Sequence, residues 1–99
     1  MTDNKVKPTV YILSDSVGET AELVAKAAAS QYNGGQVEVR RIPYVNDEDT
    51  IRETVAEARE NGGIIVYTII TPFLRELVRN LARRAHVPQA DIMGPVMDA

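Results

Sequence analysis

The sequence predicts an α/β fold, a three-layer sandwich with a four-stranded parallel sheet at its centre. Short β-branched or apolar runs at 9–13, 36–42 and 64–70 alternate with amphipathic segments of helical period. Glycine or proline separates most of these segments. Strands joined through helices by right-handed crossovers form a parallel sheet that is covered by helices on both faces.

The first strand and the first helix are expected at 9–13 and 21–32. The strand segment is Thr-Val-Tyr-Ile-Leu, and the helical segment is rich in alanine. Asn-Gly-Gly at 33–35 then predicts a left-handed helix end, because glycine and asparagine adopt positive φ most readily.

The second strand is expected at 36–42, where valine alternates with Glu38 and Arg40. Such alternation is typical of a half-exposed strand, and we expect it at a sheet edge. The acidic run 46–49 predicts the start of a second helix, and Gly62-Gly63 predicts its end.

The third strand is expected at 64–70, an almost continuous apolar run that is typical of a strand covered on both faces. Thr71-Pro72 predicts the cap and first turn of a third helix, which Pro88 ends. A short last strand is expected at 90–93, and no element of its own at 96–99.

Two strand orders fit this alternation, 3-2-1-4 and 2-1-3-4. The second places the charged second strand at the edge and the apolar third strand inside, so we predict order 2-1-3-4, a Rossmann/flavodoxin-like arrangement. A crevice should then open where the chain reverses direction, at the carboxyl ends of the first and third strands. We expect residues 14–18 and Thr71 to line it.

The candidate ligand-binding residues lie between the first strand and the first helix. They are Ser14, Asp15, Ser16, Gly18 and Thr20. Backbone N–H groups at a helix start, hydroxyl groups and a glycine that permits close approach suit a phosphate. The competing interpretation is structural, because Ser16-x-x-Glu19 matches a capping box worth about 1 kcal/mol to the helix.

Candidate partner-binding residues lie on the third helix. Arg75 and Arg79 are four residues apart, so they share a helical face that could receive a phosphate or an acidic partner surface. A solvated face explains the same pattern, because arginine is a good helix former.

No catalytic residue and no metal ligand is predicted. His86 is the single histidine and is expected at a helix end, and no nucleophile-elbow pattern accompanies it. The acidic residues 47–49 are explained as first-turn residues of a helix. Neither a Gly-x-Gly-x-x-Gly turn nor a Gly-x-x-x-x-Gly-Lys-Ser/Thr loop occurs.

Composition predicts one domain over residues 1–99 and a cytoplasmic location. The chain has no cysteine, no apolar signal-peptide core and no apolar run long enough for a membrane span. A net charge of −3 disfavours non-specific nucleic-acid binding. We therefore expect neither nucleic acid nor membrane as a partner.

Four collinear blocks resemble the N-terminal part of the pyruvate, phosphate dikinase and phosphoenolpyruvate synthase regulatory protein family. They are SDSVGETAE at 14–22, RRIPYV at 40–45, GGIIV at 62–66 and DIMGPVMD at 91–98. The resemblance implies a bifunctional enzyme that phosphorylates a threonine of its target with ADP and removes that phosphate by phosphorolysis. It also implies that the phosphate-binding loop lies in a C-terminal kinase domain, which no position of this chain matches.

Three hypotheses follow. In the leading one, the chain is the N-terminal domain of such a regulator, is not catalytic and serves recognition of the dikinase or the synthase, or assembly; ADP and phosphate then belong to the full-length protein. The alternative is an autonomous phosphate- or nucleotide-binding module that uses residues 14–20. The third is architectural, with the domain packing on the missing kinase domain or forming a homodimer.

Overall fold

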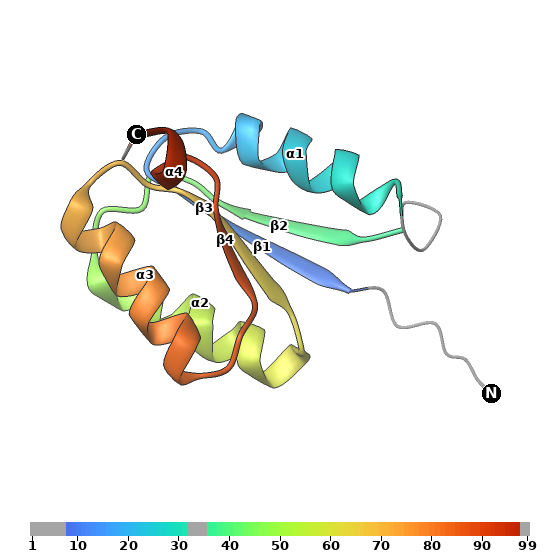
Figure 1. Cartoon of the computed structure of the whole chain (residues 1–99). Helices are drawn as coiled ribbons and strands as arrows, with labels where there is room; N and C mark the ends of the chain where they lie inside the picture. Colours follow the sequence, from blue (N-terminus) through green and yellow to red (C-terminus); the bar gives the residue numbers. More distant parts are fainter. Residues whose placement is uncertain (1–7, 32–35, 98–99) are drawn as a thin grey trace.

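The computed structural model of the chain describes residues 8–31 and 36–97. Strands and helices alternate along these residues (Figure 1). In chain order they are β1 (Thr9–Ser14), α1 (Glu19–Ala29), β2 (Glu38–Ile42), α2 (Glu48–Asn61), β3 (Ile64–Thr68), α3 (Pro72–Arg84), β4 (Gln89–Asp91) and α4 (Gly94–Met97).

The four strands form one parallel sheet in the order β2-β1-β3-β4. The predicted fold class and strand order are therefore confirmed. The charged strand β2 lies at an edge and the apolar strand β3 lies inside, because β3 has two hydrophobic faces to bury and β2 does not. The register pairs Ser14 with Thr68, so two hydroxyl side chains end neighbouring strands.

Helices cover both faces of the sheet (Figure 1). On one face, Tyr11, Ile65 and Tyr67 pack with the buried residues of α2 and α3, and this cluster is the larger part of the core. On the other face, Ile12 and Val66 pack against α1. The residues that α1 buries are alanines, which let the helix lie close to the strands.

The ends of α2 follow local sequence signals. Asp47 is the N-cap, and its carboxylate accepts a hydrogen bond from the Thr50 N–H at 2.9 Å. Gly62 ends the helix with φ 65°, the left-handed conformation that favours glycine. Both ends of this helix are as predicted. Pro72 likewise lies in the first turn of α3, after Thr71.

The predicted capping box of α1 is wrong. The N-cap is Gly18, with φ 90° and no side-chain cap, so Glu19 is the first helical residue instead of the third. Ser16 does not cap the helix. Its N–H and its hydroxyl group are both bonded to the Ser14 Oγ, at 3.0 and 3.2 Å, which turns the side chain toward the strand end. The loop therefore closes on the strand end, and α1 starts at Glu19, two residues after the start that a Ser16 cap would give and two before the predicted start at residue 21.

The C-terminal elements also differ from expectation. β4 is Gln89–Asp91, one residue earlier than the predicted start and two before the predicted end. Residues 96 and 97 were expected to have no element, but they belong to α4. Asp91 explains both differences, because its carboxylate accepts a hydrogen bond from the Gly94 N–H at 2.6 Å and turns the chain into α4. The predicted glycine stop at 33–35 lies outside the described residues.

Candidate functional site: a crevice at the carboxyl ends of β1 and β3

A crevice of about 330 Å³ opens at the carboxyl ends of β1 and β3, where the chain changes direction across the sheet. This is the place at which open α/β sheets bind their ligands. The lining residues come from the loop after β1, from the end of β3 and from the segment after β4. They are Asp15, Ser16, Val17, Gly18, Glu19, Thr20, Thr68, Ile70 and Met93.

Three hydroxyl groups form a chain at the floor of the crevice. The Thr68 hydroxyl donates to the Ser14 Oγ at 3.1 Å, and the Ser16 N–H donates to the same oxygen at 3.0 Å. These two bonds occupy both lone pairs of the Ser14 oxygen. The Ser14 hydroxyl therefore acts as the donor to the Ser16 Oγ, 3.2 Å away. The Ser16 hydroxyl, which is exposed, is thereby left with its own hydrogen to donate outward.

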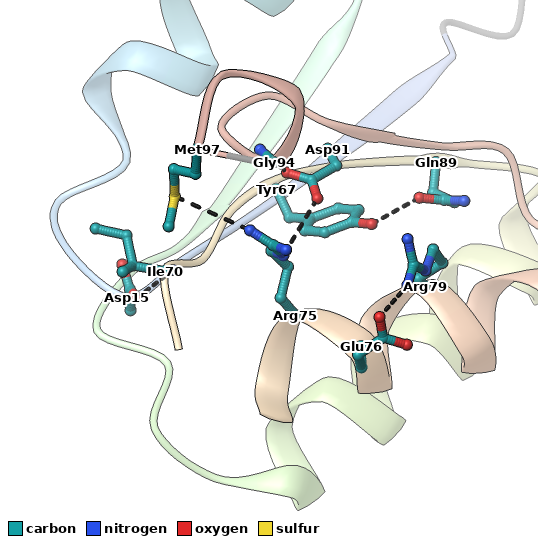
Figure 2. A network of polar contacts seen from close by, with 10 residues as sticks. All are labelled: Asp15, Tyr67, Ile70, Arg75, Glu76, Arg79, Gln89, Asp91, Gly94 and Met97. Carbon is teal, nitrogen blue, oxygen red and sulfur yellow. Dashed lines mark hydrogen bonds and ion pairs between the residues drawn. The ribbon is translucent and has the colours of Figure 1, made fainter. Parts of the chain in front are cut away.

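Asp15 ties the β1 loop to the end of β3. Its Oδ2 accepts a hydrogen bond from the Ile70 N–H at 2.7 Å (Figure 2), and its own N–H lies 3.4 Å from the Thr68 carbonyl oxygen. The Asp15 carboxylate is therefore engaged by the backbone, which fixes the mouth of the crevice between the two strands.

The loop between β2 and α2 is tied to the same place. The Tyr44 N–H donates to the Ser16 carbonyl at 3.0 Å, and the Val45 N–H donates to the Ser14 carbonyl at 2.8 Å. Three loops from three neighbouring strands are thus held together around residues 14–16.

Gly18 is required by both its backbone and its surroundings. Its φ of 90° disfavours any L side chain, and a Cβ there would lie 3.1 Å from the Arg41 Cγ.

The Arg41 guanidinium binds Glu22, with Nε 2.8 Å from Oε1. Hydrogen bonds from Lys26 and then from Arg41 lower the pKa of Glu22. The nearest cation to the loop is therefore already engaged by a carboxylate.

The opposite side of the site is built from α3, β4 and α4 (Figure 2). Arg75 forms an ion pair with Asp91 at 3.6 Å, and its Nη1 lies 4.0 Å from the sulfur of Met97. Behind them, the Tyr67 hydroxyl donates to Gln89 at 2.8 Å. Burial, and then the charge of Asp91, raise the pKa of Tyr67 to about 12, so this phenol stays neutral.

The structure brings most of the predicted ligand-binding residues together. Asp15, Ser16, Gly18 and Thr20 line the crevice, while Ser14 is fully buried beneath it. The expectation that Thr71 lines the crevice is wrong, because the chain turns away into α3 after Ile70. Ligand binding by these residues stays a prediction.

Thr68, Ile70 and Met93 were missed by sequence reasoning. The place of Thr68 in the site could have been predicted, because its hydroxyl group stands near the end of the otherwise apolar third strand, where the crevice was expected. Met93 could not, since its position depends on where the segment after β4 folds back over the sheet.

Arg75 and Arg79 do not present one open face. The Arg75 side chain is 16% exposed and reaches toward β4, whereas that of Arg79 is 43% exposed and pairs with Glu76 on α3. Partner binding stays a prediction for both, but only Arg79 is well placed to meet a separate protein.

Other candidate features are weaker. A larger hollow, of about 580 Å³, lies between the outer surfaces of α2 and α3, away from the strand ends and their hydroxyl groups. Within residues 8–31 and 36–97, no group of three or more His, Cys, Asp or Glu side chains could hold a metal ion. None of the helices in these ranges has the length and apolar character that a membrane span requires.

The fold and the crevice define an α/β domain of doubly wound type with its candidate site at the topological switch point. Comparison with known families is more specific. Residues 10–99 match the model of the kinase/pyrophosphorylase family, and the chain belongs to that family.

The similar curated proteins are named pyruvate, phosphate dikinase regulatory proteins. That of Shouchella clausii is 50% identical over 97 residues, covering 98% of this chain and 36% of the relative. That of Bacillus subtilis is 52% identical over 91 residues, covering 90% of this chain and 34% of the relative. The chain thus spans about a third of the length of these relatives. The sequence-based family assignment is confirmed.

Proposed function

We propose that this chain acts as the N-terminal domain of a regulator of pyruvate, phosphate dikinase and that it recognises the target or holds the assembly together without catalysing phosphate transfer. The observation that carries the proposal is the family match over residues 10–99, in a chain with no phosphate-binding loop motif. Phosphoenolpyruvate synthase is the alternative target that the resemblance allows.

The chemistry of the crevice supports a non-catalytic role. Its side chains are hydroxyl groups, aliphatic groups and the carboxylates of Asp15 and Glu19. A transferred phosphoryl group needs cations or a metal to balance its charge. Arg41 and Arg75, the arginines beside the crevice, are each paired with a carboxylate of this chain.

Phosphate transfer and target binding are tested separately. Incubation of the purified chain with ADP and pyruvate, phosphate dikinase should leave the mass of the dikinase unchanged, while a full-length relative serves as the positive control. Transfer by the chain alone contradicts the non-catalytic role. Immobilised dikinase should nevertheless retain the chain, and complete absence of binding to both dikinase and synthase contradicts the recognition role.

Arg79 offers a specific test of the predicted partner-binding face. Arg79→Glu should weaken binding to the dikinase if this face meets an acidic surface, and Arg84→Glu, on the side of α3 that faces α2, is the control. Arg75→Glu is less informative, because it would place two carboxylates together at Asp91. A loss of binding in Arg75→Glu counts as a surface effect only if the variant melts at the same temperature as the parent chain.

The second candidate function is binding of a phosphate or nucleotide in the crevice. The outward-donating hydroxyl of Ser16 and the close backbone approach at Gly18 favour it. Calorimetric titration with phosphate, pyrophosphate, ADP and ATP tests it. Saturable binding that Ser16→Ala abolishes and Ser30→Ala, on the exposed end of α1, does not affect would support it; no heat with any of the four ligands contradicts it.

A further inference from the structure

Large hydrophobic side chains are exposed around the crevice, at the carboxyl edge of the sheet. Tyr44 is 67% exposed, Phe73 61% and Val96 74%. They come from three different segments, which follow β2, β3 and β4. We call the exposed hydrophobic residues of this edge the apolar rim; its members are Val17, Tyr44, Ile70, Phe73, Val96 and Met97.

The segments that carry the rim are linked by backbone and side-chain contacts. The Tyr44 N–H is bonded to the Ser16 carbonyl and the Ile70 N–H to the Asp15 carboxylate, so these hydrogen bonds link the three loops to one another. On the α3 side, Arg75 contacts both Asp91 and Met97, which holds α4 against α3 (Figure 2). Apolar groups gathered in this way on a fixed surface mark an interaction site.

Tyr44 provides an independent sign of function. Its φ is 55°, a left-handed conformation that is a genuine outlier for a bulky residue. The backbone at this position serves the fold, because the Tyr44 N–H bonds to Ser16 and the next residue, Val45, is buried, but the ring itself is mostly exposed. A large aromatic ring that a strained backbone holds out in solvent is consistent with a recognition residue, because strained residues cluster at functional sites.

The charge around the rim is negative. Asp15 and Glu19 lie beside the crevice, and Asp49 lies in the first turn of α2, five residues after Tyr44. Among the described residues, none of these three carboxylates forms an ion pair with a cation, whereas Arg41 and Arg75 on the same edge are paired with Glu22 and Asp91.

We propose that the apolar rim docks a segment of the regulated target protein that carries apolar side chains flanked by lysine or arginine. The inference rests on the proposed recognition function and names the surface and the chemistry that it uses. A second copy of the chain is disfavoured as the occupant, because two such edges would place unpaired carboxylates opposite each other.

Binding of rim variants to immobilised dikinase tests the proposal. Tyr44→Asn and Phe73→Ser should each weaken binding by about tenfold or more, because aromatic residues at the centre of an interface carry most of its energy. Leu23→Ser on α1, where Leu23 is 70% exposed, is the matched control and should change binding less than about twofold.

Folding effects are separated by the choice at position 44. Asparagine tolerates the left-handed conformation, so Tyr44→Asn should melt no lower than the parent chain.

The charge of the rim is tested separately. Asp49→Lys should weaken binding, and raising the salt concentration should weaken binding of the parent chain, because the rim is expected to meet cations.

The binding results separate the role of the apolar rim from the proposed recognition of the dikinase. If the chain binds the dikinase but the Tyr44 and Phe73 variants bind as tightly as the parent, the rim is overturned and the recognition function stands. If binding is lost in Arg79→Glu and kept in the Tyr44 and Phe73 variants, the contact face is the outer side of α3 around Arg79, and the rim is again overturned. Sedimentation that shows a dimer abolished by Tyr44→Asn would assign the rim to a second copy and overturn the proposed partner.

If the chain binds neither the dikinase nor the synthase, the recognition function fails. The rim is then tested with a synthetic peptide that alternates leucine and lysine, and with the same peptide carrying glutamate in place of lysine. Binding of the lysine peptide alone, weakened by Tyr44→Asn and not by Leu23→Ser, supports the rim; equal binding of both peptides overturns it.

Discussion

Asp91 and Arg75 face each other between β4 and α3, with the carboxylate Oδ2 3.6 Å from the guanidinium Nε. Both side chains are largely buried, at 19% and 16% exposure. The same carboxylate holds the Gly94 N–H, and a Cβ at Gly94 would overlap it. This single acidic residue therefore connects α3, β4 and α4, and it places Met93 at the crevice.

Replacing Asp91 by asparagine should lower the free energy of unfolding by about 1 kcal/mol. Asparagine keeps an oxygen for the Gly94 N–H but loses the attraction to Arg75. For a domain of this size the melting temperature should fall by roughly 4–8 °C. Arg79→Gln on the exposed part of the same helix is the control, and an equal loss in both variants would contradict a special role for Asp91.

Ser14→Ala should cost about 1–3 kcal/mol of stability. The Ser14 oxygen accepts hydrogen bonds from the Ser16 N–H and the Thr68 hydroxyl, and it is fully buried, so the change leaves two donors without an acceptor. Urea unfolding measures the loss. Ser30→Ala, at the exposed end of α1, should change stability by less than about 0.5 kcal/mol. Similar values for the two variants would show that the hydroxyl chain contributes nothing.

His86→Gly should raise the free energy of unfolding by about 0.5–1 kcal/mol. His86 follows α3 with φ 58°, and its N–H and that of Val87 bond to the carbonyls of Arg83 and Ala82, which is the Schellman pattern. Gly62 occupies the same position after α2, so Gly62→Ala should have the opposite sign. Thermal melts of both variants check the pair, and destabilisation by His86→Gly would show that the imidazole makes contacts of its own.

Stability should fall in acid partly through Glu22 and Asp47. The pKa of Glu22 is lowered from 4.5 by Lys26 and Arg41, and that of Asp47 is lowered from 3.8 by the Thr50 N–H and hydroxyl. The unfolded chain therefore binds more protons as the pH falls through these values. The stabilisation is complete above about pH 5 and is lost progressively below about pH 4.

The double variant Glu22→Gln, Asp47→Asn should flatten this part of the pH profile. Asparagine still caps α2, so the helix itself is kept. Urea unfolding at several pH values between about 3 and 6 gives the slope for the parent and the variant. An unchanged slope would show that other carboxylates account for the acid sensitivity.

Sequence pattern was sufficient for the sheet and for the ends of α2, because the signals there are local. The alternation in β2 and the apolar run of β3 report how many faces each strand buries, which decides their places in the sheet. Asp47 and Gly62 act on the backbone of their own helix. The location of a crevice after β1 followed from the strand order.

The sequence alone determined the α/β class, the order 2-1-3-4 and the family, because strand burial and collinear motifs are properties of the chain itself. Only the tertiary structure decided that Ser16 bonds to Ser14 instead of capping α1, that Arg75 is engaged by Asp91, and that the backbone of Tyr44 is bonded to that of Ser16 beside the crevice. Each of these depends on contacts between segments far apart in sequence, which no local pattern specifies.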